Sequence, residues 1–147
     1  MGLILELEES DFVGYIDDGA VYTAMVVGIK VSDRTWTDPD GNVVKFLEWK
    51  FTLVTDDKFD GRDVWGRTTT KFTTNPNCKL YVWAEAILGI HLPPRYRLDT
   101  DDLLDRQCRV EIAREEYEKD GTTRETNKVR AVLPAIGSLI AAEPEPF

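Results

Sequence analysis

The spacing of apolar residues changes its period once along this chain, and that change limits the possible folds. Between residues 76 and 89 apolar side chains recur every three or four positions, which predicts an amphipathic helix. The positions are Leu80, Trp83, Ala84, Ile87 and Leu88. Thr74 or Asn75 is expected to cap the start of this helix, with Gly89 just past its end. On both sides the period is two, as in strands.

Three strands are predicted before the helix and two after it. They cover about residues 21–31, 43–55, 62–71, 107–116 and 123–133. Asp38-Pro39-Asp40-Gly41-Asn42 is the turn signal between the first two strands. Three strands, one helix and two strands is the order of the OB fold, a five-stranded Greek-key barrel. We therefore predict an all-β OB-fold barrel with a helix between strands 3 and 4.

One domain between two acidic ends is predicted for this chain of 147 residues. Residues 1–18 hold six acidic residues and no Lys or Arg, which indicates an acidic N-terminal arm. The OB-fold domain is expected at 19–134 and a C-terminal acidic tail at 135–147. The net charge is −9, but residues 19–97 hold 11 basic and 9 acidic residues. This distribution permits a local anion-binding face without establishing one.

The outward faces of the second and third strands combine aromatic and basic side chains. Bases stack on exposed aromatic rings, and phosphates follow basic side chains, so such a face is typical of single-strand binding. Tyr22 is expected on the polar face of the first strand, and Arg34 and Trp36 in the loop after it. The predicted nucleic-acid-binding residues are Tyr22, Arg34, Trp36, Phe46, Lys50, Arg62, Trp65, Arg67, Lys71, Lys128 and Arg130. The alternative for the exposed basic residues is a solvated face that prevents edge-to-edge pairing of sheets.

Few residues favour catalysis, metal binding or a membrane location. His91 is the single histidine and is interpreted as structural, and the chain has no Cys-x-x-Cys or His-Glu-x-x-His motif. The acidic run from Asp99 to Asp105 lacks a calcium-loop pattern and is interpreted as a capping or polar loop. No enzyme, cofactor or metal is predicted. Cys78 and Cys108 are expected to be buried free thiols in a reducing cytoplasm, with no membrane span or secretory signal.

In its order of elements and its last residues, the chain resembles phage-type and bacterial single-stranded DNA-binding proteins of the OB fold. Residues 12–133 match in strand order. An acidic tail ending in Phe commonly docks onto replication and repair proteins in those families. The matching residues here are Glu143, Glu145, Pro146 and Phe147. The resemblance implies binding of single-stranded DNA in phage or bacterial replication or recombination; a homodimer is compatible with the sequence.

Two other functions stay open at this point. One is an OB-fold protein–protein interaction module, such as a phage accessory or host-inhibiting factor, which the charge of −9 favours. The other is a metal-dependent nuclease, for which Glu48, Asp60 and Asp63 are scattered in strand register.

Overall fold

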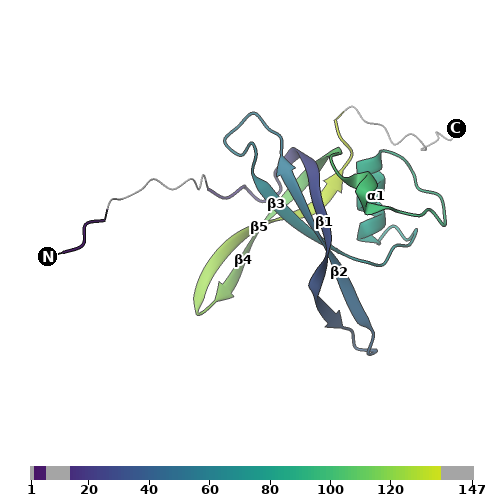
Figure 1. Ribbon diagram of the computed structural model, residues 1–147, viewed down its shortest axis with the longest axis horizontal. Coiled ribbons are helices and arrows are strands. Elements are labelled where there is room, and N and C mark those ends of the chain that lie inside the picture. Colours follow the sequence, from purple (N-terminus) through teal and green to yellow (C-terminus); the bar gives the residue numbers. More distant parts are fainter. Residues whose placement is uncertain (1, 6–13, 137–147) are drawn as a thin grey trace.

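The computed structural model describes residues 2–5 and 14–136, and its main feature is a closed sheet of five strands. The strands are β1 (Val21–Thr37), β2 (Val43–Leu53), β3 (Asp63–Thr69), β4 (Gln107–Lys119) and β5 (Thr122–Leu133). Helix α1 (Lys79–Leu88) lies between β3 and β4, and a short 3-10 helix, η1 (Thr100–Leu103), precedes β4 (Figure 1). The predicted all-β class, with one α-helix between the third and fourth strands, is confirmed.

The five strands form a closed ring whose shortest contact, between β3 and β5, we call the seam. Its strand order is β1-β2-β3-β5-β4, and β4 pairs back onto β1. Four of the five neighbour pairs are antiparallel, whereas β3 and β5 are parallel. The β3–β5 register contains the one pair Trp65 and Lys128. Side chains at this seam therefore lie where the strands before α1 meet the strands after it.

Aromatic side chains from β2 and α1 fill the centre of the core. Trp49 and Phe51 are completely buried, and both rings meet Trp83 edge to face, with centroids 5.3 and 5.9 Å away. The Trp49 indole N–H donates to Thr68 Oγ1 at 3.0 Å, so its polar atom is satisfied. Gly66 leaves room for Trp83, because a Cβ at this position would lie 2.6 Å from the indole. Trp83, predicted on the apolar face of the helix, is therefore confirmed as a core residue.

A bulge in β1 changes which residues face the core. Val26 pairs with Phe51 and Ile29 with Trp49, so three steps along β1 match two along β2. Val27 is the extra residue. Since side chains alternate, the inserted residue turns odd-numbered Ile29 toward the core, whereas Ala24 and Val26 face it before the bulge. The uninterrupted alternation predicted for residues 21–31 is therefore wrong.

Two boundaries also differ from prediction. β1 continues to Thr37, so its connection to β2 is a tight turn in which Asp38 Oδ1 accepts from the Asn42 N–H at 2.8 Å. Helix α1 begins at Lys79, after a turn closed by a bond from the Cys78 N–H to the Asn75 carbonyl. This corrects the predicted start near residue 76. The predicted end is confirmed, because Gly89 adopts the left-handed conformation that stops a helix.

The two free cysteines differ in burial. Cys108 is completely buried, and desolvation raises the pKa of its thiol to about 12. Cys78 is only half-buried beside the start of α1, so the prediction that both thiols are buried is wrong for this residue.

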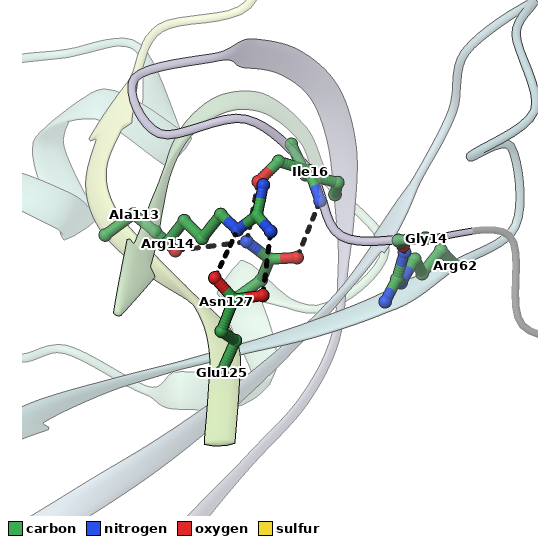
Figure 2. A network of polar contacts seen from close by, with 7 residues as sticks. All are labelled: Gly14, Ile16, Arg62, Ala113, Arg114, Glu125 and Asn127. Atoms are coloured by element: carbon green, nitrogen blue, oxygen red, sulfur yellow. Dashed lines mark hydrogen bonds and ion pairs between the residues drawn. The ribbon is translucent and has the colours of Figure 1, made fainter. Parts of the chain in front are cut away.

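The segment at residues 14–18 packs onto the β4–β5 side of the sheet. Ile16 is completely buried, and the Asn127 side chain bonds both its N–H (2.8 Å) and its carbonyl (2.9 Å), as a neighbouring strand would (Figure 2). The Arg62 guanidinium donates to the carbonyl of Gly14 (Figure 2). Burial and hydrogen bonds therefore hold this segment against the sheet.

Candidate nucleic-acid interface

A cavity of about 630 Å³ lies over the β3–β5 seam, and we call it the seam cavity. Residues of β2, β3, β4, β5 and α1 line it: Glu48, Trp65, Gly66, Arg67, Lys79, Ala113, Glu115, Lys128, Val129 and Arg130. Four of the eleven predicted binding residues, from β3 and β5, are among them. The strand pairing thus brings together residues that are about 60 positions apart in sequence.

The outer face of β2 and β3 continues from this cavity. Lys50 lies opposite Trp65, and Glu48 lies opposite Arg67 in the antiparallel register. Phe46 is two residues along β2 from Glu48, so its side chain projects from the same face. The predicted alternation of β2 and β3 is therefore confirmed. Trp65 keeps 53% of its surface exposed, and the Lys50 ammonium lies 5.9 Å from the centre of its ring.

Two cations of the cavity lie over aromatic rings and, within residues 2–5 and 14–136, form no ion pair. The Arg67 guanidinium is 4.9 Å from the centre of the Phe46 ring, and the Lys79 ammonium is 4.7 Å from that of Trp83. Desolvation lowers the pKa of Lys79, and the positive charges of Lys128 and Arg67 lower it further. Among the described residues, the lining thus holds four cations and two glutamates, in a protein of negative net charge.

The other cations of this region are paired with carboxylates. Lys50 lies 3.4 Å from Asp63, and Lys128 lies 3.2 Å from Glu115. Arg130 binds Glu111 at 3.0 Å and also Asp18. Hydrogen bonding to Glu111 and the charge of Asp18 raise the pKa of Arg130. These cations must exchange a carboxylate for any phosphate they bind.

The β1–β2 hairpin extends the face with further aromatic surface. Trp36 pairs with Val44, which lies on the same side of β2 as Phe46, and Trp36 is 54% exposed. The prediction that Trp36 lies in a loop is wrong, since β1 runs through it. Arg34 also lies in β1, exposed, within the register shift between Val31 and Thr35.

Three residues that sequence reasoning missed share this side of the molecule. Lys79 is the first residue of α1. It lines the cavity because the start of the helix lies over the seam, which the sequence alone does not show. Tyr117 and Arg124 are paired across the β4–β5 hairpin, on the same face as Glu115 and Lys128. The alternation of side chains along β4 and β5 would have been enough to predict that Tyr117 and Arg124 lie on this face. In Figure 1 the tips of both hairpins, β1–β2 and β4–β5, extend beyond the rest of the sheet.

Three predicted residues lie elsewhere. Tyr22 is half-buried against the core and meets Phe59 edge to face, so its predicted position on a polar face is wrong because the inward positions before Val27 are even-numbered. Arg62 contacts Gly14 and lies over Phe59, away from the cavity lining. Lys71 is exposed beyond the end of β3 and does not line the cavity.

Some predictions fall outside the described residues. These are the tail residues Glu143, Glu145, Pro146 and Phe147, together with most of the acidic arm. Within the described chain, no group of three or more His, Cys, Asp or Glu side chains is arranged to hold a metal ion. Asp99 caps η1 through a 2.9 Å bond from the Asp101 N–H, as the capping interpretation expected. Neither described helix has the length and apolar character needed to cross a bilayer.

Comparison of the chain with protein-family models finds no match, and comparison with curated proteins finds none either.

Proposed function

We propose that the closed sheet is an OB fold and that the protein binds single-stranded DNA across its seam cavity. The strand order, the parallel β3–β5 contact and the position of α1 all agree with an OB barrel. In that fold, oligonucleotides lie on the face of strands 2 and 3, between the connections β1–β2 and β4–β5. The seam cavity and the aromatic face of the β1–β2 hairpin occupy the corresponding region.

One observation carries the proposal: a half-exposed tryptophan lies in a cavity beside cations that have no carboxylate partner among residues 2–5 and 14–136. Trp65 offers a flat surface for a base, and stacking contributes about 1–3 kcal/mol per base. Arg67 and Lys79 line the same cavity, so they would supply positive charge to the phosphates of a strand stacked there. Stacking on Trp65 needs an unpaired base, which favours a single strand over a duplex. The phage or bacterial replication or recombination setting, and partner proteins that bind the tail, belong to this proposal through the resemblance.

Intrinsic tryptophan fluorescence tests the proposal directly. Trp49 and Trp83 are buried, whereas Trp36 and Trp65 are exposed, so a bound oligothymidylate should quench the two exposed residues. At low salt we expect saturable quenching that is reduced in Trp65→Phe and in Trp36→Phe. Electrophoretic shifts with single-stranded and duplex probes should favour the single strand. No quenching and no shift at low salt would contradict the proposal and favour the protein-interaction module.

The state of the DNA after incubation distinguishes a binding protein from a nuclease. Labelled single-stranded DNA incubated with the protein and magnesium should remain intact and be protected from an added nuclease. Cleavage that depends on magnesium would contradict a purely binding role.

A further inference from the structure

The cations around the seam cavity divide into two groups, and this division predicts how the site responds to phosphate. Arg67 and Lys79 lie over aromatic rings, whereas Lys128 lies beside a carboxylate. An unpaired cation in solution holds mobile counterions, which a nucleic acid displaces with a gain in entropy. A cation paired with a carboxylate of the same protein contributes less of this entropy, because that carboxylate belongs to the chain and is not released into solution.

Glu115 is the carboxylate best placed to act as such a counterion. It lies on β4 on the same face as Lys128, because Ala113 pairs with Lys128 and Glu115 is the next residue on that side. The Glu115 carboxylate is 3.2 Å from the Lys128 ammonium, and both groups line the seam cavity. The side chains are 51% and 59% exposed, so the pair is open to solvent and separates at little cost.

We propose that Glu115 acts as a built-in competitor of DNA phosphate for Lys128, and so weakens binding and flattens its salt dependence. This inference rests on the proposed function. The Glu115 carboxylate pairs with Lys128 when DNA dissociates, and the pair separates when a DNA phosphate binds Lys128.

The test compares Glu115→Gln with Glu118→Gln in titrations of an oligothymidylate at several salt concentrations. Glu118 is exposed on the same β4–β5 hairpin but on its opposite face, so both variants change the net charge equally. Glu115→Gln should bind about two- to fivefold more tightly at low salt, the range expected for removing one exposed ion pair. Its plot of log K against log salt should be steeper by about 0.7, as for one more neutralised phosphate.

The Lys128→Gln variant completes the design. In its background, Glu115→Gln should lose most of its extra tightening relative to Glu118→Gln, because Lys128 is gone and only the more distant charge of Lys79 still acts on Glu115. Equal effects of Glu115→Gln and Glu118→Gln in the wild-type background would overturn this inference while leaving DNA binding intact. No binding by any of these proteins at low salt would overturn the proposed function itself, and the inference with it.

Discussion

Two cavities of nearly equal size lie on this molecule, and their linings differ in charge and aromatic exposure. The seam cavity has a volume of about 630 Å³, and a second cavity, beside Tyr22 and Asp57, has about 670 Å³. The seam cavity contains Trp65 and the cations Arg67 and Lys79. In the part of the chain that the structure describes, the second cavity is lined by two aspartates, one arginine and no tryptophan. Volume therefore does not distinguish the candidate site, whereas exposed aromatic surface and unpaired charge do.

The polar groups of the second cavity are already used within the protein. The Phe59 N–H donates to Asp57 Oδ1 at 2.8 Å, and the Tyr22 hydroxyl also bonds this carboxylate. Burial and the hydrogen bond to Asp57 raise the pKa of Tyr22. Arg109 donates to the Pro134 carbonyl at 2.8 Å. These groups stabilise turns and strand ends, so a ligand would have to break existing bonds to use them.

The largest expected difference between the cavities comes from their aromatic residues. Trp65→Ala removes the stacking surface of the seam cavity and should weaken oligothymidylate binding about five- to 150-fold, from the 1–3 kcal/mol of one stacked base. Tyr22→Phe, in the second cavity, keeps the ring that packs on Phe59 and should leave the affinity unchanged. Titration by fluorescence anisotropy of a labelled oligonucleotide measures both. A Tyr22→Phe effect as large as that of Trp65→Ala would reverse the assignment.

A smaller difference is expected from the cations. Arg67→Gln or Lys79→Gln should weaken binding about fivefold at low salt, and should flatten the log K against log salt slope by about 0.7, one phosphate contact each. Arg109→Gln removes the same charge from the second cavity and should leave the slope unchanged. Melting temperatures measured in parallel separate a loss of binding from a loss of folding. Equal slope changes in all three variants would indicate that only the net charge matters.

Much of the fold follows from local patterns, because each element depends on its own residues. The alternation of β2 and β3, and the end of α1 at Gly89, need only side-chain period and backbone preference. The bulge at Val27 does not follow from a local pattern. Val27 fits either face of a strand, and only pairing with β2 selects it as the extra residue. The misplaced face of Tyr22 follows from that one residue.

The candidate site was predictable only in part, for a similar reason. Trp65 and Arg67 followed from alternation along β3. Lys79 did not, because the sequence predicts the helix but not where its first residue lies relative to the seam. Which cations are paired with carboxylates was also beyond prediction, since Lys128 and Glu115 meet through the register of β4 and β5. Residue type indicates a charge, whereas strand pairing decides whether that charge is available.

The smallest expected effect on DNA binding belongs to Asp57, and its role should appear in the pH dependence of folding instead. The backbone bond from Phe59 and the bond from Tyr22 hold the pKa of Asp57 below its ordinary value of 3.8. A carboxyl with a lowered folded-state pKa stabilises the fold above its unfolded pKa, and this stabilisation is lost as the pH falls through the folded pKa. Asp57→Asn should therefore lower the melting temperature at neutral pH and show a shallower further fall below about pH 4. Thermal unfolding followed by circular dichroism from pH 7 to pH 3 measures this.

DNA affinity provides the second readout for the same variant. Asp57→Asn should change oligothymidylate binding less than twofold, because Asp57 holds a turn together and does not compete for a cation of the seam cavity. Glu115→Gln removes the same charge beside Lys128, so it is the matched comparison. If Asp57→Asn tightened binding as much as Glu115→Gln, the carboxylates would act through the overall field of the protein. The two cavities would then be electrostatically equivalent, and the contrast between them would rest on Trp65 alone.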